Sequence, residues 1–241
     1  MTMAERIESV ERRIVEACRR SGREREEIEV IAVTKYVGVD TTREALRQGL
    51  RHLGENRWQD ASAKWREISG AGDGGAEYEA AGEQAIWHFI GSLQTNKVKD
   101  VIGKFTYIHS LDRESLAEAI DKRAEQLGIV VPCFIQVNVS GEESKHGLTP
   151  EALPAFARQL ADCRHIQPVG LMTMAPLDAE AEQSRPYFRA LRELRDSLNG
   201  QALLREPIRG LSMGMSGDFE VAVEEGANWL RLGTVLVGKN G

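Results

Sequence analysis

The sequence predicts a closed (β/α)8 barrel that occupies residues 1–241 as one domain. Eight short apolar stretches follow one another along the chain, each apolar enough to be buried on both faces, as parallel strands are. Helical patterns alternate with them, which indicates crossover connections between parallel strands. Eight such units in about 240 residues suit a barrel of the TIM type. An open, doubly wound sheet is the alternative arrangement of the same units.

An amphipathic helix precedes the first predicted strand, at residues 4–20. Ile7, Val10 and Ile14 fall on one face of this helix. The chain ends just after the eighth predicted strand, so no long helix follows that strand. We therefore expect the opening helix to fill the place on the barrel wall that an eighth helix would take.

The predicted strands are apolar stretches bounded by turn residues. In the first of them, Val30 to Val33 lead into Thr34 and Lys35, so a lysine ends a stretch that is otherwise apolar. Pro132 lies near the start of the fifth strand, where a missing N–H group is tolerated. In chain order, we predict strands at residues 29–35, 51–56, 86–92, 106–111, 129–140, 166–174, 208–214 and 228–238.

End signals define the helices between these strands. Thr41 is followed three residues later by a glutamate, which is the spacing of a capping box. Asp112 opens a later helix that Gly128 closes. Thr149 caps the next one, with Pro150 at its first position. After the opening helix, we predict helices at residues 40–49, 56–68, 96–105, 112–128, from 150 onward, 178–198 and 218–226.

Composition restricts the class of protein. The formal charge of −6 argues against a general nucleic-acid binder, and no apolar run approaches the length of a membrane span. The charged N-terminus does not resemble a signal peptide, so we expect a cytoplasmic protein. Three widely spaced cysteines without a CxxC pair indicate inert thiols rather than disulfides or a zinc site. Residues 69–84, glycine-rich and acidic, predict a surface loop.

Two glycine- and serine-containing segments follow the seventh and eighth predicted strands, where barrels of this type commonly bind phosphate. The first runs from Ser212 through Ser216 to Gly217, and the second contains Gly233 and Thr234. Glycines allow backbone N–H groups to approach an anion, and Ser216 is placed to cap the helix that follows. Each segment alone is equally well explained as a tight turn. Together, at the expected strands, they predict a phosphate site.

Lys35 ends the first strand and so would lie at the mouth of the barrel, across from this phosphate site. A lysine with a lowered pKa forms a Schiff base with an aldehyde. Pyridoxal phosphate (PLP) carries both an aldehyde and a phosphate. Arg231 precedes Gly233 by two positions, so it points to the same side of the strand and can face a pyridine nitrogen. A lysine that merely extends to solvent is the alternative interpretation of Lys35.

Other residues of the strand ends are assigned to packing. His88 and His109 lie on different strands and have no carboxylate at metal-ligand spacing, so we interpret them as core or rim histidines rather than ligands. The methionines of the sixth and seventh strands, from Met172 to Met215, are more often packing residues than cofactor contacts. We therefore predict no metal site.

Several long motifs in one order resemble the pyridoxal phosphate homeostasis proteins, which are relatives of the N-terminal barrel of alanine racemases. The motifs are "VTKY", "GEN", "WHFIGSLQTNK", "VNVSGEESKHGL", "GLMTMAP", "LSMGMSGDFEVAVEEG" and "RLGT". The resemblance covers about residues 5–238. It implies an alanine racemase N-terminal-domain-like barrel that buffers or carries PLP and takes part in vitamin B6 and amino-acid homeostasis, without strong catalysis. It also implies apo PLP-enzymes as acceptors, and a monomer or weak dimer.

The resemblance further implies a role for each residue of the cofactor site. Lys35 would carry the Schiff base and Arg231 would contact the pyridine nitrogen. The remaining cofactor-binding residues would be Asn56 in the pocket wall, Ser216, Gly233 and Thr234 at the phosphate, and Met215 and Ser212 nearby. Val37 departs from the family pattern, in which many members have a second lysine at this place. No residue is assigned a catalytic role.

Two other functions are compatible with a lysine at this position. A PLP-dependent racemase needs a second base on the opposite face of the cofactor, which in such enzymes comes from an added domain that this chain has no room for. An arginine at the pyridine nitrogen would also weaken the electron sink. A Schiff-base aldolase would act on a sugar phosphate, but its lysine usually lies on a later strand. A yellow protein would favour PLP over the aldolase.

Overall fold

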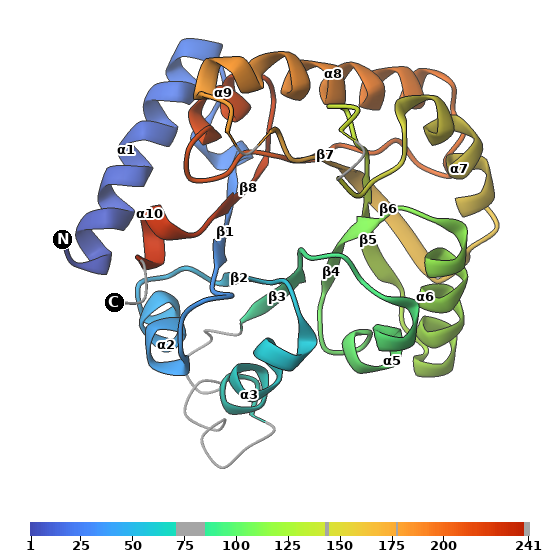
Figure 1. Cartoon of the computed structure of the whole chain (residues 1–241), viewed down its shortest axis with the longest axis horizontal. Helices are drawn as coiled ribbons and strands as arrows, with labels where there is room; N and C mark the ends of the chain where they lie inside the picture. The colour runs from blue at the N-terminus through green and yellow to red at the C-terminus, as the bar shows by residue number, and fades with distance from the viewer. Residues whose placement is uncertain (71–84, 143–144, 177, 239–241) are drawn as a thin grey trace.

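The computed structural model describes residues 1–70, 85–142, 145–176 and 178–238. Within these residues, the strands pair in parallel in chain order, and β1 pairs with β8 to close the barrel (Figure 1). The predicted barrel is confirmed, and the open sheet is excluded. The strands are β1 Glu29–Val33, β2 His52–Glu55, β3 Ile86–Phe89, β4 Tyr107–Leu111, β5 Val131–Gln136, β6 Ile166–Met172, β7 Gly210–Ser212 and β8 Trp229–Leu232.

Most predicted strands extend too far at their C-terminal ends. β1 ends at Val33, so Lys35 lies in the turn that follows and not in the strand. β8 ends at Leu232, and residues 234–237 form a one-turn helix, α10 Thr234–Val237, instead of continuing the strand. The cause is the same in both places, because the chain leaves the ladder to turn toward the next helix. The polar strand ends therefore belong to the loops around the barrel mouth.

The predicted opening helix is confirmed as α1 Met3–Ser21. Its first turn has a capping box, in which the Thr2 hydroxyl accepts from the Glu5 N–H and the Glu5 carboxylate accepts from the Thr2 N–H. The helix contacts α9 Phe219–Glu224 and α10 on the outside of the barrel (Figure 1). Arg13 of α1 donates two hydrogen bonds to the Glu220 carboxylate, at 3.0 and 2.7 Å. As expected, α1 covers the wall beside β8 and β1.

Some predicted helix ends are confirmed and others are wrong. Gly128 closes α6 Glu114–Leu127 in the left-handed conformation, and the Thr149 hydroxyl accepts the Ala152 N–H at 3.3 Å. Thr41 is not a cap, because α2 Val39–Arg47 already begins after Gly38, directly from the turn that follows β1. Asp112 is not a cap either, because the N-cap position of α6 is Arg113; the Asp112 carboxylate accepts from the Arg113 side chain at 2.7 Å. The other helices are η1 Arg25–Glu27, α3 Trp58–Ile68, η2 Thr95–Lys97, α5 Val98–Val101, η3 Pro150–Ala152, α7 Leu153–Leu160 and α8 Ala181–Gly200.

The helix predicted at residues 96–105 is only partly formed. It is divided between η2 and the single turn of α5, and the chain then bends at Gly103, whose φ is +92°. Such a φ is accessible to glycine but strained for other residues, so Gly103 allows the turn that follows Ile102, where the chain has already left the helix. The loop predicted at residues 69–84 falls almost entirely outside the described residues.

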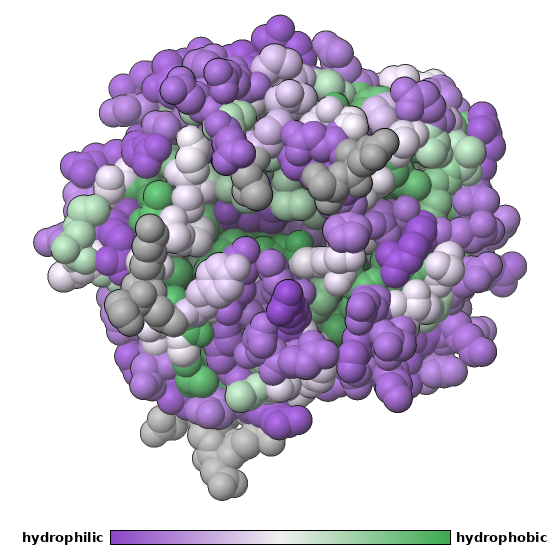
Figure 2. Space-filling model, in the orientation of Figure 1, coloured by the Kyte–Doolittle hydropathy of each residue, from purple (hydrophilic) through white to green (hydrophobic). Residues whose placement is uncertain are grey.

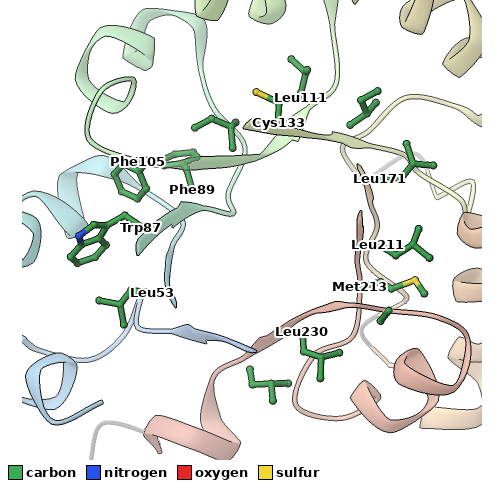
Figure 3. Packing of buried hydrophobic residues seen from close by; sticks show 14 of the residues in the cluster. Leu53, Trp87, Phe89, Phe105, Leu111, Cys133, Leu171, Leu211, Met213 and Leu230 are labelled. Atoms are coloured by element: carbon green, nitrogen blue, oxygen red, sulfur yellow. The ribbon is translucent and has the colours of Figure 1, made fainter. Parts of the chain in front are cut away.

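The apolar core lies between the barrel wall and the surrounding helices. Leu53, Trp87, Leu171 and Leu211 extend from the outer face of their strands (Figure 3) and are at most 2% exposed. The side chains of the three cysteines are unpaired, and Cys18 and Cys133 are buried. Among the residues that the structure describes, none of the helices has the length and apolar character needed to cross a membrane.

Candidate functional site

A cavity of about 350 Å³ opens at the C-terminal ends of the strands, the end where barrels of this type hold their active sites. The face of the molecule shown in Figure 2 is hollowed over the barrel, and apolar residues line part of the hollow. Seven of the eight predicted cofactor residues line the cavity, namely Lys35, Asn56, Met215, Ser216, Arg231, Gly233 and Thr234. Its volume falls within the range of small-molecule sites.

Lys35 reaches the cavity from the turn after β1. Its side chain is half-buried, and its ammonium nitrogen lies 4.9 Å from the centre of the Tyr36 ring, which is 74% exposed. The turn is closed by a hydrogen bond from the Val37 N–H to the Thr34 carbonyl, at 3.1 Å. Val37 is buried and lines the same cavity. The amine is therefore held at the rim, close to solvent but within the pocket.

A buried ion pair fixes the start of this turn. The Lys64 ammonium group of α3 donates to the Thr34 carbonyl at 2.7 Å and to the Glu55 carboxylate at the end of β2. The Thr34 hydroxyl donates to the same carboxylate oxygen at 2.6 Å. The side chains of Lys64 and Glu55 are 6% and 0% exposed. The backbone of the residue before Lys35 is thus tied to two neighbouring elements.

Sequence reasoning did not identify this pair, although a signal was present. Lys64 lies three residues after Ala61 and four residues before Ile68, and both of these are buried. A lysine on the apolar face of a helix predicts either an extended side chain or a buried partner. Glu55, in the "GEN" motif, was the only carboxylate nearby at a strand end.

Asn56 follows β2 and forms part of the cavity wall. Its backbone lies directly against Gly91, where an added Cβ would stand 2.2 Å from the Asn56 carbonyl oxygen. Only glycine permits this approach, so the loop after β3 presses on the loop after β2 at the pocket. The "FIGS" segment therefore supports the position of Asn56 without itself contributing a polar group there.

The loop after β7 forms the opposite wall of the cavity. Gly214 has a φ of +92°, and a Cβ there would stand 2.6 Å from the Ala222 side chain. Ser216 does not cap α9 as the sequence predicted. Its hydroxyl instead accepts the Gly233 N–H at 3.3 Å, while Asp218 at the helix start accepts the Met215 N–H at 2.6 Å. The two loops predicted to bind phosphate are therefore joined to each other.

Arg231 lies at the floor of the cavity and is 4% exposed. Its guanidinium donates to the Ser212 hydroxyl at 2.7 Å and to the Thr173 carbonyl at 2.8 Å. Burial lowers the pKa of Arg231 to about 10, and the charge of Asp218 opposes this shift. The group remains a cation at neutral pH. Ser212, the eighth predicted residue, is fully buried behind Arg231 and is not part of the cavity wall.

Histidines fill part of the barrel interior below Arg231. His109 lies 2.8 Å from the Ser212 hydroxyl and 2.9 Å from His88, which in turn lies 2.9 Å from His52. Their interpretation as core histidines agrees with this arrangement, but sequence reasoning did not predict that they form a continuous chain. The available signal was their alternation, because His52, His88 and His109 occupy inward positions on three successive strands.

The other predicted features lie where packing would place them. Met174 and Met215 line the cavity, whereas Met172 and Met213 are buried. Two further cavities, each of about 560 Å³, lie elsewhere on the surface. One is near the start of β6 and the other is between α6 and α7, so neither contains the strand-end residues.

Comparisons with known proteins agree with this geometry. A sequence model of the family described as "Alanine racemase, N-terminal domain" matches residues 8–241. The pyridoxal phosphate homeostasis protein of Aquifex aeolicus is 44% identical over 240 residues, 99% of each chain. Its Pseudomonas aeruginosa counterpart is 38% identical, covering 98% of this chain and 95% of the other.

Solved structures extend the comparison to the fold. The structure of PipY from Synechococcus elongatus, described as having PLP bound, superimposes with a TM-score of 0.81 at 36% identity. The match covers 98% of this chain and 100% of PipY. The chain therefore belongs to the family of pyridoxal phosphate homeostasis proteins, within the alanine racemase N-terminal domain family.

Proposed function

We propose that this protein binds PLP in the strand-end cavity and buffers or carries it, rather than using it for strong catalysis. One observation carries the proposal: an amine, two hydroxyls and a buried guanidinium line a single cavity, from Lys35, Ser216, Thr234 and Arg231 respectively. These groups suit the aldehyde, phosphate and ring nitrogen of one PLP molecule. The names of the relatives support the same ligand.

The cavity residues fit the cofactor at each of its polar groups. When PLP is bound, its aldehyde supplies the chemistry of a Schiff base with an amine, and Lys35 is the lysine of the cavity wall. Ser216 and Thr234 offer hydroxyl donors to the phosphate, beside the backbone of Gly233. Arg231 can only donate, so it suits an unprotonated ring nitrogen.

The same arginine favours a carrier over a racemase. An unprotonated pyridine ring stabilises negative charge poorly, so proton removal from an amino acid gains little from the cofactor. A racemase compensates with two bases on opposite faces. We assign one amine, Lys35, to the cofactor. Tyr36 also lines the cavity, but its ring is 74% exposed and lies beside Lys35, so we assign no base to the opposite face of the cofactor. Within the cell, apo PLP-enzymes would be the acceptors, and vitamin B6 and amino-acid levels the readout.

The test of PLP attachment is the Lys35→Ala variant. The protein incubated with PLP should be yellow and should retain the cofactor after borohydride reduction, whereas Lys35→Ala should lose both properties. PLP should still bind the variant weakly through its phosphate. Lys99→Ala, which removes an exposed lysine of α5, is the matched control and should behave as the wild type. An unchanged spectrum in Lys35→Ala would overturn the assignment.

The test of carrier against enzyme is α-proton exchange. The PLP-loaded protein should incorporate deuterium into L-alanine in heavy water only very slowly, as followed by NMR. It should also release PLP to an apo-enzyme, whose recovered activity measures the transfer. Exchange at rates typical of enzymes, roughly 1–10³ per second, would restore the racemase interpretation.

A further inference from the structure

A chain of hydrogen-bonded side chains runs through the barrel interior from Arg231 toward the opposite end. Arg231 donates to the Ser212 hydroxyl at 2.7 Å, and this oxygen lies 2.8 Å from Nδ1 of His109. Nε2 of His109 lies 2.9 Å from Nδ1 of His88, and Nε2 of His88 lies 2.9 Å from Nδ1 of His52. Each link between two histidines joins Nε2 of one ring to Nδ1 of the next. We call His109, His88 and His52 the histidine column.

The column is enclosed by aromatic rings. Tyr107 stacks on His88 with 4.6 Å between ring centres, and Phe134 stacks on His109 at 4.3 Å. Trp229 contacts His88 from β8. Burial holds the pKa of His88 and of His109 well below 6.5. Each of these imidazoles is therefore neutral at physiological pH, with one nitrogen that donates and one that accepts.

Burial also lowers the pKa of His52, whose side chain is 18% exposed. His52 is the first residue of β2, at the end of the barrel away from the cavity. Its Nε2 lies 3.6 Å from the Glu29 carboxylate, too far for a hydrogen bond but close enough for electrostatic attraction. The column thus reaches from a buried cation to a carboxylate that is 51% exposed.

The two ends give the column a direction. A guanidinium only donates and a carboxylate only accepts. Since the Ser212 oxygen accepts from Arg231, its own proton is available to Nδ1 of His109. His109 then carries its proton on Nε2 and donates to His88, which does the same toward His52. His52 in turn presents its Nε2–H to Glu29. In this sense every donor between Arg231 and Nδ1 of His52 has an acceptor, and the acceptor nitrogen of each ring lies on the side toward Arg231.

We propose that the histidine column and Ser212 are positioning residues for Arg231, which hold its guanidinium at the cavity floor through a one-way series of hydrogen bonds. The inward-facing acceptor nitrogens stabilise a buried cation that has no carboxylate hydrogen-bonded to it among the described residues. The N–H donors of Arg231 that are not given to Ser212 and to the Thr173 carbonyl therefore remain available to the cavity. The role assigned to Arg231 at the cofactor ring rests on the proposed function. The direction of the hydrogen bonds along the column does not depend on the proposed function.

One consequence concerns the protonation of His52. A charged His52 carries N–H on both nitrogens, so His88 and His109 must shift their protons to Nδ1. His109 and Arg231 then both donate to Ser212, whose hydroxyl proton loses its acceptor inside the barrel. The intact column therefore opposes the charging of His52. The other charged groups near the column are Glu29 and Arg51 beside His52 and Asp218 near Arg231; Tyr107 beside His88 is titratable but neutral, because burial raises its pKa.

The first measurement needs no variant and no cofactor. Two-bond ¹H–¹⁵N correlation NMR of the wild-type protein distinguishes the two neutral tautomers and the charged form of each histidine. We expect His52, His88 and His109 all to carry the proton on Nε2 at pH 7.5. An Nδ1–H tautomer, or a charged ring, at His88 or His109 would refute the proposal.

The second measurement tests coupling along the column. His109→Phe keeps a ring against Phe134 but interrupts the chain, so the pKa of His52 should rise. The expected rise is about one to two pKa units. In the intact column, charging His52 leaves the buried Ser212 hydroxyl proton without an acceptor, and in the variant this cost no longer depends on His52. His109→Gln offers both an acceptor and a donor and should keep the pKa of His52 near its wild-type value. Phe134→Leu disturbs the packing of His109 but leaves every nitrogen in place.

The outcomes separate the column from its surroundings. A rise of the His52 pKa in His109→Phe alone supports the proposal. No rise in that variant, or an equal rise in Phe134→Leu, would contradict it. The spectrum of added PLP, recorded on the same samples, reports the proposed function independently. If the tautomers are as expected but the protein binds no PLP, only the proposed function is refuted. If the protein binds PLP but the histidines have other tautomers, only the role of the column is refuted.

Discussion

Single hydroxyl groups determine how the two loops at the proposed phosphate site meet. Ser216 receives the Gly233 N–H, so its oxygen connects the loop after β7 to the loop after β8. Thr234 is exposed at the first position of α10, and among the residues that the structure describes its hydroxyl does not join the two loops. The two residues should therefore differ in how strongly they affect the pocket itself.

Replacing either hydroxyl should weaken PLP binding through the phosphate. A hydrogen bond to a charged group contributes roughly 1.5–3 kcal/mol, so Ser216→Ala and Thr234→Ala should each lower the affinity by about ten- to a hundredfold. Ser216→Ala should have the larger effect, because it also releases Gly233. Titration with PLP and with pyridoxal, which lacks the phosphate, provides the comparison. If both ligands lost affinity equally, the hydroxyls would not contact the phosphate.

At the scale of the element, the turn after β1 depends on α3 and β2. The Lys64–Glu55 pair joins these elements and also binds Thr34, directly before Lys35. Lys64 donates to the Thr34 carbonyl, and the Glu55 carboxylate accepts from the Thr34 hydroxyl. A buried pair of this kind is costly to break from one side, because the remaining charge keeps no partner. The position of the cavity lysine is therefore linked to a helix that contributes nothing else to the predicted site.

Lys64→Met should destabilise the protein by about 3–5 kcal/mol, because it leaves the Glu55 carboxylate buried without a cation. Urea unfolding followed by circular dichroism measures this loss. The double variant Lys64→Met with Glu55→Gln removes both charges and should recover part of the stability. A loss in the single variant no larger than in the double variant would show that the pair is not a coupled unit.

The limits of prediction also follow from the elements. The sequence was sufficient for the barrel and for placing Lys35, Ser216, Arg231, Gly233 and Thr234 at the strand ends, because strand order and the side of each strand end follow from periodicity. Asn56 and Met215 were assigned to the cavity through the family resemblance. It was not sufficient for the end of β1, since no glycine or proline separates Thr34 and Lys35 from the apolar stretch although the chain has already turned. The roles of Lys64 and of the histidines depend on contacts between strands and helices that are distant in sequence. No local pattern specifies such contacts.

For the whole molecule, the histidines inside the barrel link stability to pH. Burial keeps the pKa of His88 and of His109 well below 6.5 in the folded protein. The unfolded chain takes up a proton at each as the pH falls through 6.5, whereas the folded chain does not. These two residues therefore leave the free energy of unfolding undiminished above pH 6.5, and they lower it as the pH falls below 6.5.

Below pH 6.5, each of these two histidines should reduce the free energy of unfolding by about 1.4 kcal/mol per pH unit. Urea unfolding at pH 7.5, 6.5 and 5.5 gives the slope. Carboxylates contribute to this slope as well, so the informative comparison is with His88→Phe. The slope of this variant should be shallower by the contribution of one histidine, about 1.4 kcal/mol per pH unit. Identical slopes in the two proteins would mean that His88 titrates equally in the folded and unfolded states.

The contact between α1 and α9 has a consequence for synthesis on the ribosome. Arg13 and Glu220 are 207 positions apart, so the partner of α1 is translated long after α1 itself. At 5–20 residues per second, roughly 10–40 seconds pass before that surface exists. During this interval the apolar face of α1, with Val10, Ile14 and Ala17, has nothing to cover it. During this interval the nascent chain therefore presents an amphipathic segment with an uncovered apolar face, and chaperones that bind such segments have time to act.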